Sequence, residues 1–372
     1  MKLLGGLLAA MAALFVVAVL AYADVVNLPG QWRTTLGFQE ATPDPPCHPG
    51  LYRRSPDSPP PPPGHWRSEP ETPKSQVEGS ATAIGSTIYV TGGSRPGNLH
   101  TVLAFDTRSK RWKEPAQLPV GLNHSPSAAH DGKLYLAGGF LEGDGETNRF
   151  FEFDPATNRW RELPPMKQAR GGGGAVVIGD LLYVVDGGAQ PYNVTGVKPP
   201  KPLLEIFDFE TETWSTATPP PVGVHHVGVA VVDGEIYMAG GRFGEEESSG
   251  EFVRYDPATD RWTRLPSLPQ GPTSSLGTVA AGGKIVVFGG DDEAGWEDGG
   301  GWVTPSAWAF DPRTGRWQRL PDLGVERHAF AAATDDGRIY AIGGAICPGL
   351  KPNGPVTTHT VESLPVSSLR HG

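Results

Sequence analysis

Several ionisable residues occupy matching places in a repeated sequence, and their side chains could bind a polar ligand or transfer protons. The matching place lies eleven residues before a recurrent tyrosine. Its occupants are Glu78, His124, Gly172, His226 and, in a copy with valine in place of the tyrosine, Ser275. Beside this place stand Arg170, His225 and His328. A glutamate close to a histidine can act as a general acid–base pair, so these residues form the first candidate site.

The same side chains could instead hydrogen-bond the backbone of neighbouring loops. Three histidines from different copies could also ligate a transition metal. The acidic residues Asp291, Asp292 and Glu293 do not match the calcium-binding loop of EF-hands. We therefore predict ligand-binding residues at these places, with no metal, no cofactor and no assigned catalytic residue.

A second group of candidates lies between the repeated phrases. Arg242, Trp296 and Trp302 stand there beside carboxylates such as Glu245 and Asp291. An aromatic plane beside carboxylates suits a sugar, an amine or a peptide. Solvated acidic loops with incidental aromatic side chains are the alternative interpretation.

Six copies of one phrase must position all of these residues. Each copy begins with a tryptophan and reaches a glycine doublet 26 or 27 residues later. The tryptophans are Trp66, Trp112, Trp160, Trp214, Trp262 and Trp317. The doublets begin at Gly92, Gly138, Gly187, Gly240, Gly289 and Gly343. A period of roughly 50 residues with strand-like contents indicates a β-propeller, in which we expect the tryptophans to pack between neighbouring blades.

Each copy contains signals for four short strands. An apolar run, a tight turn such as Asp233-Gly234 and a second run lead to the doublet; a third strand then ends at an aspartate, as at Asp154. The length variation lies in the loop that joins the second strand to the third. In an up-and-down blade this loop shares one face with the loop that joins the fourth strand to the next blade. That face, with variable loops on a constant scaffold, is the predicted binding face.

The two ends of the repeated region complete each other. Trp66 has no doublet before it, and the last doublet is followed by a plausible third strand near Val361 but by no tryptophan. We therefore predict that the Trp66 strand closes the sixth blade by pairing with the strand near Val361, since closure removes exposed sheet edges. The predicted propeller spans residues 65–372.

The repeated phrase resembles the kelch motif over about residues 65–365, and the chain is similar to bacterial-type kelch-repeat proteins. The resemblance implies an all-β, six-bladed kelch β-propeller, but little about function, because propellers host unrelated activities. Galactose oxidase, of this family, uses a tyrosine cross-linked to a cysteine, and no such tyrosine and histidine set accompanies Cys347. The sialic acid mutarotase has an acid and an arginine at its channel mouth, parts that Glu78 and Arg170 fit by position without a longer motif match.

The N-terminal region differs from the repeats. Residues 3–23 carry no charge, and Ala21-Tyr22-Ala23 fits a cleavage site, so residues 1–23 are predicted to be a signal peptide or an uncleaved membrane anchor. Residues 24–64 form a Pro-rich linker whose five prolines, Pro59 to Pro63, favour a semi-rigid spacer. In an exported protein the two cysteines, Cys47 and Cys347, favour a disulfide.

The composition narrows the range of partners. The net charge is −10 with no basic run, which argues against nucleic acid. We predict an exported, monomeric propeller, secreted, periplasmic or on the cell surface, that binds an unidentified protein or glycan through the face defined above, with possible membrane attachment through residues 3–23. The alternatives are a sugar-processing enzyme such as a sialic acid mutarotase-like epimerase, and a purely structural envelope protein.

Overall fold

The computed structural model describes residues 60–94, 100–141, 145–188, 201–243, 247–292, 301–335, 337–347 and 356–370. The chain divides into two units, Met1–Cys47 and His48–Gly372, and the described residues all belong to the second. Within them no helix is long and apolar enough to cross a membrane. The predicted leader, most of the linker, Cys47 and Trp296 lie outside the described residues, so their predictions stay predictions.

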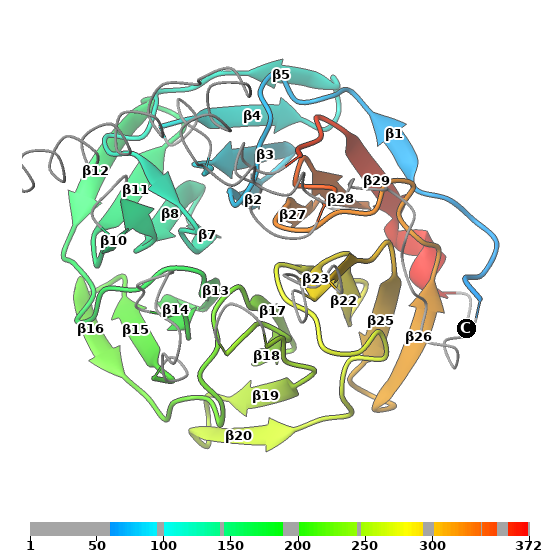
Figure 1. Ribbon diagram of the computed structural model, residues 1–372. Helices are drawn as coiled ribbons and strands as arrows, with labels where there is room; N and C mark the ends of the chain where they lie inside the picture. Colours follow the sequence, from blue (N-terminus) through cyan, green and yellow to red (C-terminus); the bar gives the residue numbers. More distant parts are fainter. Residues whose placement is uncertain are drawn as a thin grey trace, which may run out of the picture. The chain divides into compact units, whose positions relative to one another are not determined.

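The described part of the second unit is built from four-stranded antiparallel sheets arranged in a ring (Figure 1). Five sheets are each continuous in the sequence apart from loops. They are β2 (Ser80–Ile84), β3 (Thr87–Thr91), β4 (Val102–Asp106) and β5 (Arg111–Lys113); β7 (Ser127–His130), β8 (Lys133–Ala137), β11 (Phe150–Asp154) and β12 (Arg159–Leu163); β13 (Gly174–Ile178), β14 (Leu181–Val185), β15 (Leu204–Asp208) and β16 (Thr213–Thr216); β17 (Gly228–Val232), β18 (Glu235–Ala239), β19 (Phe252–Asp256) and β20 (Arg261–Arg264); and β21 (Gly277–Ala281), β22 (Lys284–Phe288), β25 (Ala307–Asp311) and β26 (Arg316–Leu320).

A sixth four-stranded sheet joins the two ends of the described chain. Its members are β27 (Ala331–Thr334), β28 (Arg338–Ile342), β29 (Val361–Pro365) and β1 (Arg67–Glu69). β1 pairs antiparallel with β29, Glu69 opposite Val361 and Arg67 opposite Ser363. The first strands β2, β7, β13, β17, β21 and β27 contact one another in a closed cycle around the ring. The strand that begins directly after the first tryptophan therefore completes the last sheet.

Several short elements lie outside the six four-stranded sheets. Two-residue strands lie in the loops, namely β6 (Leu122–Asn123), β9 (Phe140–Leu141), β10 (Gly145–Glu146), β23 (Asp291–Asp292) and β24 (Trp302–Val303). A 3-10 helix, Val366–Arg370, follows β29. The sequence fits these turns: Asp131 and Gly132 take positive φ angles between β7 and β8, as a tight hairpin turn requires. The Asp154 carboxylate accepts a hydrogen bond from Ala156 N at the turn after β11, as predicted.

The tryptophans link each sheet to its neighbour, as the sequence predicts. Each indole N–H donates to the backbone carbonyl four residues after the preceding tryptophan, at 2.8 to 3.0 Å. The pairs are Trp112–Pro70, Trp160–Ala116, Trp214–Pro164, Trp262–Thr218, Trp317–Pro266 and Trp66–Pro321. The last pair joins residues far apart in the sequence, so the same bond recurs where the chain ends meet.

The glycine doublets make a second set of bonds between sheets. Gly139 N donates to the carbonyl of Arg170 at 2.8 Å, and Gly344 N donates to the carbonyl of Gln76. A Cβ on Gly138 would collide with that Arg170 carbonyl oxygen, and the φ of Gly138 is +70°. Both observations exclude a side chain at this position.

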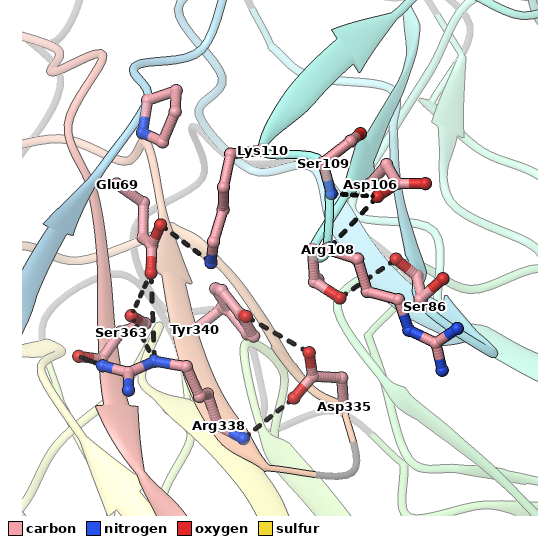
Figure 2. Close-up of polar contacts among 12 residues, drawn as sticks. Glu69, Ser86, Asp106, Arg108, Ser109, Lys110, Asp335, Arg338, Tyr340 and Ser363 are labelled. Carbon is pink, nitrogen blue, oxygen red and sulfur yellow. Dashed lines mark hydrogen bonds and ion pairs between the residues drawn. The ribbon is translucent and has the colours of Figure 1, made fainter.

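Figure 2 shows polar contacts that hold β1 against the neighbouring strands. The Glu69 carboxylate accepts from the Ser363 hydroxyl at 2.7 Å and pairs with Lys110 Nζ at 2.9 Å. Arg338 donates to the hydroxyl and the carbonyl of Ser363. Because Lys110 lies between β4 and β5, Glu69 connects the last sheet to the next sheet of the ring. Cys347 is fully buried, but its predicted pairing with Cys47 falls outside the described residues and stays a prediction.

Replacing Trp66 should open the last sheet more than replacing a tryptophan elsewhere. Trp66 is 4% exposed and packs against Phe288, with ring centroids 5.1 Å apart. We expect Trp66→Ala to lower the free energy of unfolding by about 3–5 kcal/mol, and Trp66→Phe to lose chiefly the indole bond, about 1 kcal/mol. Trp214→Ala, at a half-buried position in a sheet continuous in the sequence, is the matched control. Equal losses for Trp66→Ala and Trp214→Ala in urea titrations would contradict this role of Trp66.

Candidate functional site

The loops leading into the six first strands share one unusual backbone conformation. Each contains a residue with φ between +50° and +70°. These residues are Glu78, His124, Gly172, His226, Ser275 and Ala329. Side chains rarely adopt this left-handed region, which costs free energy for residues other than glycine. The aligned positions found in the sequence thus occupy the same place in six equivalent strained turns. The glycine at position 172 was the sequence signal for the positive φ angle.

Backbone hydrogen bonds join these six turns around the ring. Each turn donates an N–H to a carbonyl of the turn before it, at 2.8 to 3.3 Å; for example, His124 N bonds Glu78 O, and Glu78 N bonds Ala329 O. The side chains at these positions, with the start of each first strand, line a cavity of about 190 Å³. The turns therefore form the rim of a central channel. The side chains at the six turn positions lie on this rim.

Glu78, His124 and His226 come together on this rim from three different sheets. Their ligating atoms all lie within 4.8 Å of one another. Glu78 Oε1 lies 3.4 Å from His124 Nε2. Burial acts to raise the pKa of Glu78, but the charge and hydrogen bond of His124, the Ser94 hydroxyl and Arg242 outweigh it and lower that pKa to about 2. Glu78 is therefore a carboxylate at neutral pH.

Arg242 fixes the protons of the two adjacent histidines. Its Nη2 donates to His226 Nε2 at 3.1 Å, so Nε2 is an acceptor and the His226 proton lies on Nδ1. That Nδ1 lies 2.5 Å from His225 Nδ1, which must accept. Burial, followed by the charge of Arg242, lowers the pKa of His225 to about 3 and that of His226 well below its ordinary value. Both rings are therefore neutral at neutral pH.

His328 and Asp291 form a second polar pair next to the rim. His328 Nδ1 lies 2.8 Å from Asp291 Oδ2, and its Nε2 lies 2.7 Å from the carbonyl of Cys347. The Asp291 carboxylate also accepts from the Ser274 hydroxyl at 2.8 Å. Burial opposes ionisation of Asp291, but His328, Arg242 and Ser274 together lower its pKa. Two carboxylates, one guanidinium and several imidazoles thus gather at this end of the channel.

Arg170 lies elsewhere. Its side chain is 0% exposed, and its guanidinium pairs with the equally buried Glu205 of β15 at 2.5 Å. Glu205 also accepts from Lys167 N and Gln168 N. Arg327 and Glu362 repeat this arrangement in the last sheet. Arg170 therefore bonds neighbouring loops, which is the alternative to ligand binding considered in the sequence analysis. It does not line the cavity.

The structure thus sorts the predicted ligand-binding residues into groups. Glu78, His124 and His226 line the cavity, and His225, Arg242 and His328 contact or adjoin that group. Trp302 opposes Asp292 in the β23–β24 ladder and does not line the cavity. Sequence reasoning missed the roles of Glu205, Glu362 and Asp291 as ion-pair partners, because a strand glutamate or a loop aspartate carries no local sign of its distant partner.

The arrangement is suited to polar binding more than to proton transfer. A carboxylate with a pKa of about 2 is a weak base, and His226 Nε2 already accepts from Arg242. Charges of both signs in a concave rim can recognise a polar or zwitterionic group. Glu78 with the two imidazoles could also hold a metal ion.

The Arg170–Glu205 pair should be a stability element. Arg170→Ala leaves a buried carboxylate without its counter-ion, so we expect a loss of about 3–5 kcal/mol in the free energy of unfolding. Arg313→Ala, which removes the exposed pair with Asp311, should cost less than about 1 kcal/mol. The double variant Arg170→Met with Glu205→Leu should recover part of the loss. Denaturant titrations that gave Arg170→Ala the stability of Arg313→Ala would refute the assignment.

The buried neutral histidines should make the protein sensitive to mild acid. Because the folded pKa of His225, about 3, lies below its ordinary value of 6.5, the unfolded chain binds the proton first as the pH falls. Stability should therefore decrease from pH 6.5 to 5, with a slope from His225 approaching about 1.4 kcal/mol per pH unit. His225→Gln should flatten the slope by that amount, measured by urea titration across this range. An unchanged slope would show that His225 titrates normally.

Comparisons with known proteins agree with this architecture. The family described as the KLHDC2/KLHL20/DRC7 Kelch-repeats domain matches residues 64–216 and 172–353. Kelch-like protein terF of Aspergillus terreus is 27% identical over 73% of this chain and 61% of its own length. Kelch-like protein 35 of Mus musculus is 28% identical over 66% of this chain and 39% of its own.

One solved structure supports the fold independently of close sequence similarity. The structure of YjhT has a TM-score of 0.66 and 19% identity, and the match covers 79% of this chain and 96% of that one. The chain spans only about 40 to 60% of the length of the curated relatives named above. The family match covers well over half of the chain, in the region that forms the sheets. The chain therefore belongs to the kelch-repeat proteins and folds as a kelch-type β-propeller.

Proposed function

We propose that this protein is a binding protein that recognises a protein or glycan partner through the face carrying the channel rim and the loops between second and third strands. The supporting observation is that Glu78 and His226 line a concave cavity and that Arg242 donates a hydrogen bond to His226. Glu78 precedes the first strand of one sheet, whereas His226 and Arg242 flank the first two strands of another, so the proximity of Glu78 to the other two is a product of the fold. The described residues after the glycine doublets, such as Arg242 and Asp291, bridge to the segments that lead into the rim turns.

The kelch-like relatives are consistent with a binding role, although this chain spans only part of their lengths. Partner recognition at the rim of a rigid ring has a physical advantage. The rim turns are locked to one another by backbone bonds, so little ordering is needed when the partner binds. Export through residues 3–23, by cleavage or anchoring, is part of the proposal; it would place the partner outside the cytoplasm.

A screen of glycans and of extracellular protein domains against residues 24–372 tests this function. We expect at least one partner whose affinity falls by about tenfold or more in Glu78→Gln and Arg242→Ala, since a hydrogen bond to a charged group is worth about 1.5–3 kcal/mol. Arg313→Ala, on the exposed turn after β25 on the opposite face, is the matched control and should leave affinity unchanged. Partners that respond to Arg313→Ala and not to the rim variants would reject the proposed face.

A sugar-processing enzyme, such as a sialic acid mutarotase-like epimerase, is the second candidate. The short distance between Glu78 and His124 favours it, because an acid–base pair in a concave site can open and close a sugar ring. NMR of anomer exchange distinguishes the two functions. We expect no acceleration by the wild type; acceleration that is lost in Glu78→Gln would replace binding with catalysis as the primary function.

A further inference from the structure

We propose that Glu78, His124 and His226 form a binding site for a divalent transition metal ion, with Zn²⁺ as the best-suited ion. The three side chains offer one carboxylate oxygen and two imidazole nitrogens within 4.8 Å of one another. Two imidazoles and one carboxylate are a common ligand set for zinc sites that keep an open fourth position. The cavity below the rim would give that position access to solvent or to a ligand.

The His124 ring is oriented as a metal ligand would be. Its Nδ1 lies 2.5 Å from Asn123 Oδ1, an acceptor, so Nδ1 carries the proton and donates. This outer hydrogen bond fixes the tautomer and turns Nε2 inward, as partners of ligating histidines do. The His124 side chain is 9% exposed, and its Nε2 lies 3.4 Å from Glu78 Oε1.

The contact between His124 and Glu78 needs a cation. When the ring is neutral, its Nδ1 proton donates to Asn123 and the lone pair of Nε2 faces the Glu78 carboxylate, 3.4 Å away. Two acceptors facing each other at a buried position are unfavourable unless a positive charge lies between them. Either a second proton on His124 or a metal ion can supply that charge.

Arg242 is a competitor built into the same site. Its guanidinium donates to His226 Nε2, the nitrogen that keeps a lone pair when Nδ1 carries the proton. Metal binding must therefore release this hydrogen bond, and it must overcome the repulsion of a nearby positive charge. We accordingly expect Arg242→Gln to bind the metal more tightly than the wild type. A role of Arg242 in holding the turns together would instead make that variant weaker in both stability and binding.

Titration of the tag-free, metal-free protein with Zn²⁺ by calorimetry, and with Co²⁺ by visible absorption, tests the site. We expect one ion per chain and a Co²⁺ spectrum with the intensity of four- or five-coordinate cobalt. Glu78→Gln and His124→Ala should lose this binding, and Asn123→Ala should weaken it by about 10- to 100-fold. His130→Ala is the matched control, because His130 also lies 3.4 Å from a carboxylate, that of Asp180, but belongs to no such triad among the described residues.

Two results would overturn the proposal. One is the absence of a stoichiometric Zn²⁺ or Co²⁺ complex in the wild type. The other is binding that His130→Ala reduces as much as His124→Ala does, which would identify adventitious surface binding. No partner is present in these titrations. The metal-site proposal can therefore be rejected while the proposed partner recognition is retained, and the partner proposal can be rejected while the metal site is retained.

Discussion

The structure depends on hydrogen bonds that each sheet makes to its neighbour through its loops. Near the outside of the ring, each tryptophan donates to a carbonyl of the adjacent sheet, and near the channel the positive-φ turns bond one another. In both sets the same bond recurs between the last sheet and the first, at Trp112–Pro70 and Glu78–Ala329. A sheet alone has unpaired edges and a half-buried face. The repeated bonds make each sheet depend on both neighbours.

The candidate site is a consequence of this arrangement. A turn with positive φ costs free energy at a glutamate or a histidine, and the hydrogen bonds between turns offset that cost at every step. The turns converge, so residues more than forty positions apart, such as Glu78 and His124, come within contact distance. Arg242 and Asp291 reach the same region because each follows a glycine doublet that is bonded to the next turn. The charged side chains therefore lie on the rim, whereas the side chains packed between the sheets are apolar.

Much of the fold could be predicted from the sequence because it is periodic. The tryptophans, doublets and aspartates occur at constant spacing, and each has one local physical reason. The pairing of β1 with β29 followed from two incomplete copies. The site was less predictable: matching positions indicated that Glu78, His124 and His226 converge, but Arg170, two residues before Gly172, is buried against Glu205. Whether an arginine faces the channel or a strand glutamate depends on partners far away in the sequence, which spacing does not reveal.

The closed ring is tested most directly by hydrogen–deuterium exchange of β29. If β1 covers this strand as β16 covers β15, amides of residues 361–364 should exchange as slowly as those of residues 204–208. Trp66→Ala should accelerate exchange at residues 361–364 and leave residues 204–208 slow. Rapid exchange of residues 361–364 in the wild-type protein would show that the last sheet lacks its fourth strand, and would contradict the account.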